Sequence, residues 1–295
     1  GPVEVALLAA DLKAGRAIAA VNEIVLDSNS IFGRTWGNKS HKCGGEEGED
    51  DAAHAIFDAL ASSSVQTLSL GHTAMGPKAS AKLAATLRLT KVTSLTISDN
   101  PIGDDAMAEL LEGLKDVGLI SLSISNAGVG VSSAGKLAEL LSALSSATKF
   151  SGAVAKLNVT GANFGEVYKA GSLFFRVGNL PSGSGGLAFR NSCNMGDRIE
   201  GGSGPYDGEC VVAVEQTTEW IKVGENKWLP KKYLIQIDTS KPCAFQELCE
   251  ALQLSRVTDV DFSSCELNSQ GIEFLSDYVR EATGALNSVT VDSTG

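Results

Sequence analysis

The stretch Val92-Thr-Ser-Leu95-Thr-Ile97-Ser-Asp-Asn100-Pro-Ile102-Gly103 decides how this chain folds. Its residues follow the spacing apolar-x-x-apolar-x-apolar-x-x-Asn-x-apolar-Gly. Leu95 and Ile97 alternate with polar residues, which is typical of a short strand with one buried face. The ending Asn-x-apolar-Gly is typical of a turn, because Asn and Gly tolerate the backbone angles that turns need. A recurrence of this pattern along the chain decides the fold class before any single element does.

The pattern recurs. Copies begin at residues 21, 65, 92, 119, 154, 257 and 286, and the last copy is incomplete. Two successive spacings are 27 residues, and the longest spacing, from 154 to 257, contains the largest insertion. This regularity predicts one structural unit repeated along the chain.

Between the copies, the apolar period changes from that of a strand to that of a helix. Met107, Leu110, Leu111 and Leu114 fall on one helix face. The same spacing appears at Ile56, Phe57 and Leu60; Leu83 and Leu87; Leu137 and Leu141; Leu248 and Leu252; and Ile272, Leu275 and Val279. Each unit is therefore predicted to be a strand followed by a helix. Neither element buries its apolar face alone, so neighbouring units must stack.

This arrangement resembles the ribonuclease-inhibitor-type leucine-rich repeat, over about 215 residues outside the largest insertion. The resemblance implies an α/β solenoid shaped like a horseshoe, with a parallel sheet on its concave face and helices on its convex face. The Asn of the pattern is replaced by Thr73, Ala127 and Ala162 in three copies. We expect those turns to be less rigid, because an Asn at this place hydrogen-bonds to turn amides.

The helical period vanishes between residues 166 and 240. This segment is rich in glycine and holds short runs typical of strands. They are Gly186–Arg190, Cys210–Val214, Trp220–Val223 and Lys227–Leu234. Short strands separated by glycine turns favour a small all-β barrel or sandwich. The predicted organisation is therefore repeats over 1–165, an inserted β-barrel over 166–240 and further repeats over 241–295.

The insertion resembles the SH3-like barrel, bacterial type included. The resemblance is carried by Leu187-Ala-Phe-Arg190, Trp220-Ile-Lys-Val223 and Trp228-Leu-Pro230-Lys-Lys-Tyr233-Leu234. In peptide-binding members of that family, a Trp, a Pro and a Tyr from these motifs line a groove for proline-rich ligands. Trp220, Pro230 and Tyr233 stand in those places. The family's leading ALYDY motif is not evident, and an alternative interpretation assigns Trp220, Trp228 and Tyr233 to the barrel core.

The expected binding residues lie in the insertions. Outward strand positions of the repeats hold small polar residues, such as Ser69, Thr96 and Ser123, which rarely anchor an interface. We therefore expect a protein or peptide partner, proline-rich in one version, to bind the barrel and the strand-turn edge of the solenoid. The expected contacts are Trp220, Trp228, Pro230 and Tyr233, with Trp36 from the 34–50 loop.

Other classes of function have less support in the sequence. The formal net charge of −11 disfavours a nucleic-acid partner. No apolar run approaches the roughly 20 residues of a membrane span, and no leader opens the chain, so a cytoplasmic location is expected. The cysteines are then expected to be reduced, although a disulfide between Cys193 and Cys210 stays open.

No motif for catalysis stands out. The Gly33–Ser40 segment lacks the Gly-Lys pair of a phosphate-binding loop. His41, Cys43, Glu46 and His54 match no zinc spacing. We predict no catalytic residue, metal or cofactor. Two alternatives stay open: regulation of a GTPase, as by Ran GTPase activators of the same repeat type, and an enzyme with an unrecognised site.

Overall fold

The computed structural model describes residues 2–14, 21–32, 51–146, 154–282 and 286–292. The chain forms two compact units. The sheet–helix unit comprises Gly1–Gly165 and Ala244–Gly295, and the β unit comprises Glu166–Cys243. The β unit thus interrupts the sheet–helix unit in sequence, and its bounds lie close to the 166–240 segment that the sequence singles out.

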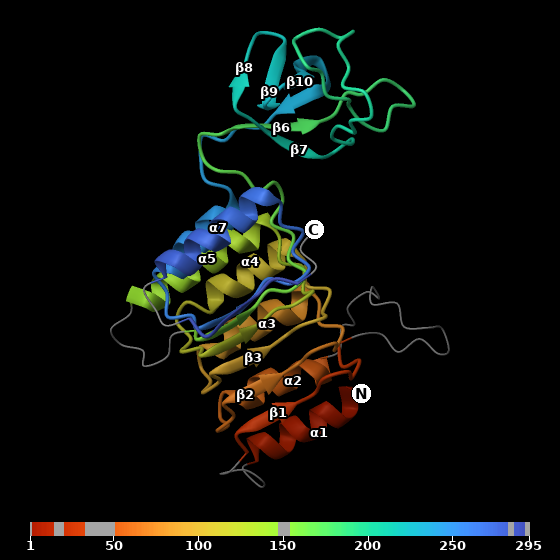
Figure 1. Ribbon diagram of the computed structural model, residues 1–295. Coiled ribbons are helices and arrows are strands. Elements are labelled where there is room, and N and C mark those ends of the chain that lie inside the picture. The colour runs from red at the N-terminus through yellow and green to blue at the C-terminus, as the bar shows by residue number, and fades with distance from the viewer. Residues whose placement is uncertain (1, 15–20, 33–50, 147–153, 283–285, 293–295) are drawn as a thin grey trace. The chain divides into compact units, whose positions relative to one another are not determined.

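In the described ranges, the sheet–helix unit holds one seven-stranded parallel sheet with the order β1-β2-β3-β4-β5-β12-β13 (Figure 1). Each strand has three residues: β1 Glu23–Val25, β2 Thr67–Ser69, β3 Ser94–Thr96, β4 Ser121–Ser123, β5 Lys156–Asn158, β12 Asp259–Asp261 and β13 Ser288–Thr290. Every pair of neighbours is in register at its central apolar residue, as Leu68, Leu95 and Leu122 are. The predicted mixed α/β architecture with a parallel sheet is confirmed.

Helices connect most of these strands and pack against one another in chain order (Figure 1). They are α1 Pro2–Lys13, α2 Asp51–Leu60, α3 Pro77–Leu87, α4 Asp104–Gly113, α5 Val131–Ser146, α6 Ala244–Gln253 and α7 Ser269–Glu281. The core lies between helices and sheet. Met107, Leu110, Leu111 and Leu114 are all fully buried, as their helical spacing predicts.

The predicted core face of α7 is wrong. Ile272 and Val279 are 46% and 53% exposed, whereas Phe274 and Tyr278 are buried beside Leu275. Apolar spacing alone does not distinguish two overlapping faces that share Leu275. Aromatic side chains bury more area than Ile and Val, which explains why the helix turns the Phe274 and Tyr278 face inward.

The backbone amides of the turn after β2 are hydrogen-bonded by an asparagine of the following repeat. Asn100 is buried, and its Oδ1 accepts hydrogen bonds from the amides of Thr73 and Met75 at 3.0 and 2.9 Å. Its Nδ2 donates to the carbonyls of Leu70 and Ile97 at 2.8 and 2.9 Å. The amides of the turn that lacks an Asn are thus bound by the Asn of the following repeat. This contact explains how Thr73 is tolerated at the asparagine position.

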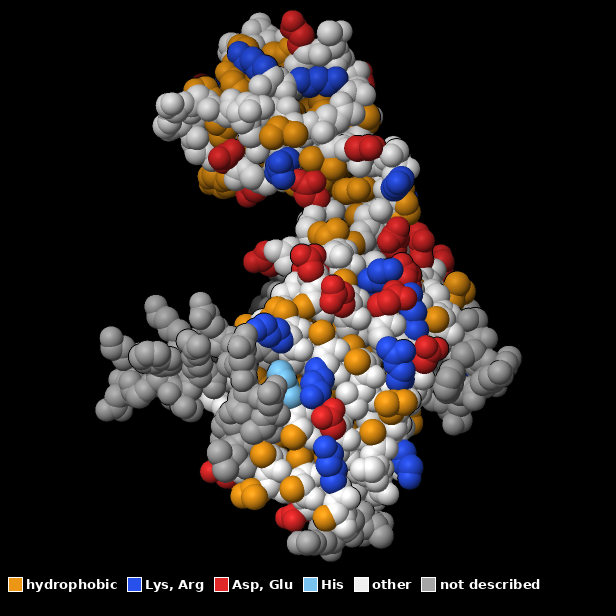
Figure 2. Space-filling view, turned by 180° about the vertical axis from the view of Figure 1, so that it is seen from behind, with side chains coloured by type: hydrophobic (Ala, Val, Ile, Leu, Met, Phe, Trp, Pro, Cys, Tyr) orange, Lys and Arg blue, Asp and Glu red, His pale blue; other side chains and the backbone are white. Residues whose placement is uncertain are grey.

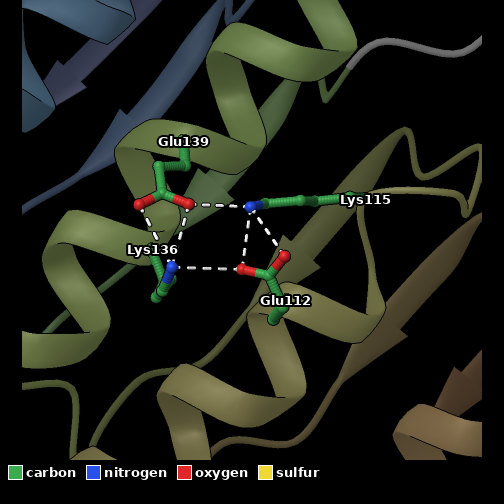
Figure 3. Close-up of polar contacts among 4 residues, drawn as sticks. All are labelled: Glu112, Lys115, Lys136 and Glu139. Atoms are coloured by element: carbon green, nitrogen blue, oxygen red, sulfur yellow. Dashed lines mark hydrogen bonds and ion pairs between the residues drawn. The ribbon is translucent and has the colours of Figure 1, made fainter.

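The helical layer is also cross-linked by charge (Figure 3). Lys115 bridges Glu112 and Glu139 at 2.7 Å each, and Lys136 pairs with the same two carboxylates at 3.2 and 3.0 Å. The bridges hold the pKa values of both glutamates below their ordinary range and those of both lysines above it. All four groups are solvent-accessible, so the cluster adds little stability per pair.

The β unit holds two three-stranded antiparallel sheets in its described residues, with the orders β10-β9-β8 and β11-β6-β7. The strands are β6 Leu173–Val177, β7 Cys210–Ala213, β8 Glu215–Gln216, β9 Trp220–Gly224, β10 Lys227–Pro230 and β11 Leu234–Gln236, with the 3-10 turn η1 Lys231–Tyr233. Their core contains Phe175, Val177, Ile221, Leu229 and Leu234.

One strand of the β unit differs from the prediction. Gly186–Arg190 forms only single bridge pairs, from Gly186 to Tyr206 and from Arg190 to Arg198 and Trp228. The central strand of the β11-β6-β7 sheet is instead β6, Leu173–Val177. Its sequence Leu-Phe-Phe-Arg-Val has no strict alternation, which explains why the apolar pattern does not reveal it.

Candidate functional site

The long connection from β6 to β7, residues 178–209, forms most of a pocket in the β unit. The pocket has a volume of about 430 Å³. It is lined by Leu180, Pro181, Ser184, Gly185, Gly186, Leu187, Ala188, Arg190, Met195, Arg198, Gly202, Ser203, Gly204 and Tyr206, with Tyr233 from η1. Its walls combine apolar side chains with hydroxyl and guanidinium groups, which can orient a ligand.

Backbone contacts hold the walls of this pocket together. The Leu187 amide donates to the Pro205 carbonyl at 2.8 Å, and the Asp207 amide donates to the Gly185 carbonyl at 3.0 Å. The approach is so close that a Cβ on Gly204 would lie 2.0 Å from the Leu187 carbonyl oxygen. Glycine is therefore required at this position, and the two walls form a fixed pair rather than a loose loop.

Two tyrosines border the pocket. Tyr206 is 60% exposed, and its amide is held by the Glu209 carboxylate at 2.9 Å. Tyr233 is half-buried, and the Lys232 ammonium lies 4.7 Å from its ring centroid. Tyrosine offers a large apolar ring with a polar end, a combination that is enriched at recognition surfaces.

The other expected binding residues lie elsewhere. Trp220 is only 7% exposed, and Pro230, its partner in the β9–β10 register, is buried too. Trp228 is half-buried, and the Lys222 ammonium lies 5.6 Å from its ring centroid. Tyr233 lines the pocket, whereas Trp220, Trp228 and Pro230 do not. Trp36 lies outside the described residues.

The sheet of the other unit offers a second hollow, of about 260 Å³, on the outward positions of β4, β5, β12 and β13. Side chains along this face already bond to one another. Ser69 donates to Asp27 at 2.7 Å, Ser98 and Ser123 lie 2.9 Å apart, and Ser125 donates to Asn158 at 2.6 Å. Groups that satisfy each other have fewer donors and acceptors left for a ligand.

The surface charge differs between the units. The β unit has nine lysines and arginines and nine aspartates and glutamates, so the net charge of −11 belongs entirely to the rest of the chain. Figure 2 shows acidic and basic side chains interspersed over one face of the molecule, with hydrophobic side chains scattered among them. The β unit therefore carries no net charge, and a negatively charged ligand is not repelled by it as it would be by the sheet–helix unit.

The described residues hold no group of three His, Cys, Asp or Glu side chains placed to bind a metal ion. His41, Cys43 and Glu46 of the sequence cluster, and the Gly33–Ser40 segment, lie outside those residues. No helix in the described part of the chain is long and apolar enough to cross a membrane.

Cys193 and Cys210 are thiols and are not joined by a disulfide. Burial, with help from the Glu166 carboxylate, raises the pKa of Cys210 to about 11. A thiol with so high a pKa is a poor nucleophile near neutral pH, because little of it is ionised.

Sequence reasoning missed Arg190, Arg198 and Tyr206. They lie in a glycine-rich segment without apolar periodicity, and only the pairing of Gly186 with Tyr206 and of Arg190 with Arg198 brings them to one pocket. Neither a scan of protein-family models nor a search of curated proteins gives a match to this sequence.

Proposed function

We propose that this protein is a non-catalytic interaction scaffold, in which the β unit captures a peptide segment of a partner protein. In this proposal the sheet–helix unit is a leucine-rich-repeat solenoid, the β unit is an SH3-like barrel inserted into it, and the protein works in the cytoplasm without a cofactor. The observation that carries the proposal is the pocket of about 430 Å³ bordered by Tyr206 and Tyr233.

Three features support a peptide as the ligand. The pocket has walls from several short segments, and its lining combines small glycine and serine residues with Leu180, Pro181 and Leu187. Exposed tyrosine and arginine are the side chains most enriched at interface hot spots. The sheet face of the other unit lacks both residue types at its hollow.

The site proposed from the structure therefore differs from the groove expected from the sequence. Tyr233 is kept, Tyr206 replaces Trp220 as the second ring, and Trp220 and Pro230 serve the interior of the β unit. Both interpretations of the motif aromatics thus apply in part: Trp220 belongs to the core of the β unit, and Tyr233 is accessible at the pocket.

A phage-displayed library of random peptides, selected on the full chain, tests the proposal. We expect enriched peptides whose affinity falls about thirtyfold or more in Tyr206→Ala, because hot-spot truncation typically costs at least about 2 kcal/mol. Tyr206 is exposed, so this variant should unfold at the same temperature as the wild type. Isothermal titration with synthetic copies of the enriched peptides gives the affinities.

The control variant is Ser123→Tyr, which fills the hollow on the sheet face. It should leave peptide affinity unchanged. If Ser123→Tyr abolishes binding and Tyr206→Ala does not, the binding site lies on the sheet and the proposal for the β unit is wrong.

A further inference from the structure

The pocket of the β unit has an unusual charge for this acidic protein. Its lining includes two arginines, Arg190 and Arg198, and no aspartate or glutamate. In the chain as a whole, acidic residues outnumber basic ones, 35 to 24. A site lined by cations alone in such a chain points to a ligand that carries negative charge.

Arg190 is committed to the protein itself. Its Nε donates to the Met195 carbonyl at 2.9 Å, and one terminal nitrogen donates to the Ala188 carbonyl at 2.6 Å. Its backbone exchanges two hydrogen bonds with Trp228, at 3.0 and 2.9 Å. Arg190 therefore positions the 190–198 segment, and its Nε and one terminal nitrogen are already bound within the protein.

Arg198 has the opposite character. Its side chain is exposed and donates to no acceptor in the described part of the chain. It is held opposite Arg190 by their backbone bridge, so the cation is fixed at the pocket although its guanidinium is unused.

Asp197 and Glu200 are the carboxylates closest to Arg198 in the sequence, and neither forms an ion pair with it in the described part of the chain. Asp197 accepts hydrogen bonds from Ser192 at 2.7 Å and from Asn191 at 3.2 Å, which lower its pKa. Glu209 accepts the amide of Tyr206. Arg198 thus lines the pocket without a direct ion pair to a carboxylate of the described residues.

We infer that the pocket recognises an acidic residue of the partner peptide, with the Asp or Glu carboxylate bound by Arg198 between Tyr206 and Tyr233. This inference rests on the proposed function and specifies its ligand. A guanidinium presents two parallel N–H groups that match the two oxygens of a carboxylate. One available arginine fits one carboxylate, whereas phosphate sites use clusters of arginines.

The test uses the same random peptide library, selected in parallel on the full-length wild type, Arg198→Gln and Lys227→Gln. Lys227 is the matched control: it is an exposed cation of the same unit, it lies over the Phe189 ring, and it does not line the pocket. The β unit carries no net charge and the rest of the chain is acidic, so enrichment of acidic peptides requires a local cause.

We expect wild type and Lys227→Gln to enrich peptides that contain Asp or Glu, and Arg198→Gln to lose this enrichment. In synthetic copies, replacing the acid by Asn or Gln should weaken wild-type binding about tenfold, the usual effect of losing a charge-assisted hydrogen bond. Added salt should weaken binding to the wild type and have little effect on Arg198→Gln, a dependence that a purely structural role of Arg198 does not produce.

The outcomes separate the inference from the proposed function. Peptides that depend on Tyr206 but bind equally well without their acid would overturn the inference and leave the proposed function standing. A phosphoserine peptide that binds more than tenfold tighter than its Asp counterpart would also overturn the inference, in favour of a phosphopeptide. Failure to enrich any peptide sensitive to Tyr206→Ala would overturn both.

Discussion

Asp104 shows how a single residue links two repeats. It lies in the first turn of α4, yet its carboxylate accepts the amides of Gly130, Ser132 and Ser133 at 3.1, 3.0 and 2.8 Å, at the start of α5. It thus caps the next helix rather than its own. A Cβ on Gly130 would lie 2.6 Å from the Asp104 carboxylate, so the cap also explains why that turn position is glycine.

This cap predicts a pH-dependent stability. Burial alone would raise the pKa of Asp104, but the hydrogen bonds from Ser133, Ser132 and Gly130 outweigh it and lower the pKa. A carboxyl whose pKa is lower in the folded state stabilises the protein above its unfolded-state pKa of about 3.9, and this contribution is lost as the pH falls through the folded-state pKa. Asp104→Ala should lower the free energy of unfolding by about 1 kcal/mol at neutral pH.

Asp105→Ala is the control, because Asp105 occupies the same helical turn but is exposed and caps no amide in the described residues. It should cost little at any pH. Urea unfolding of both variants at neutral and acidic pH measures the difference, which should shrink on acidification. Equal costs for the two variants would show that Asp104 acts only through the dipole of its own helix.

At the scale of the element, each strand of the parallel sheet has only three residues, and its central apolar residue is buried in the core in all but β13. Leu95 is fully buried between Leu68 and Leu122, which are its register partners on the two neighbouring strands. Thr96 is the next residue and is half-buried on the outward face. The same strand therefore holds one position that tolerates truncation and one that does not.

Leu95→Ala should lower the free energy of unfolding by about 2–5 kcal/mol, because it removes apolar burial and leaves a cavity. Thr96→Ala should change it by only about 0.5 kcal/mol. Denaturant titration followed by circular dichroism gives both values. Similar losses for the two variants would contradict the assignment of the strand's buried face.

At the scale of the whole molecule, the sheet–helix unit is built from the sequence before the β unit and the sequence after it. β5 and β12 pair in register although residues 159–258 separate them, and α5 packs against α6. Phe164 and Phe245 lie on either side of the interruption with ring centroids 4.8 Å apart. The β unit closes on itself, since Gly171 donates to Thr239 at 2.7 Å and Thr239 donates to Ser172 at 2.7 Å.

Deleting residues 166–240 and joining the ends with a short Gly-Ser linker should therefore leave a folded sheet–helix unit. The helices pack mainly against their neighbours in chain order, and the deletion removes none of the contacts between β5 and β12 or between α5 and α6. Circular dichroism should retain the helical signal with one cooperative thermal transition. A chain that is unfolded after the deletion would show that the two units fold only together.

The amino-acid sequence by itself determined the parallel sheet and its helices, because the strand period, the turn glycines and the helical period are all local and recur in phase. It also placed the interruption near residue 166, where that periodicity stops. Only the tertiary structure decided which way α7 faces, since Ile272, Phe274 and Tyr278 all lie within reach of Leu275 along one helix.

The candidate site was likewise decided by tertiary structure. Trp220 and Tyr233 are both expected binding residues from the sequence motifs. Long-range packing buries Trp220 and places Tyr233 at the pocket. Arg198 and Tyr206 meet Tyr233 there through backbone pairings in a glycine-rich segment that has no period of its own. Local patterns specify elements, whereas a site built from distant segments depends on contacts that only the folded chain makes.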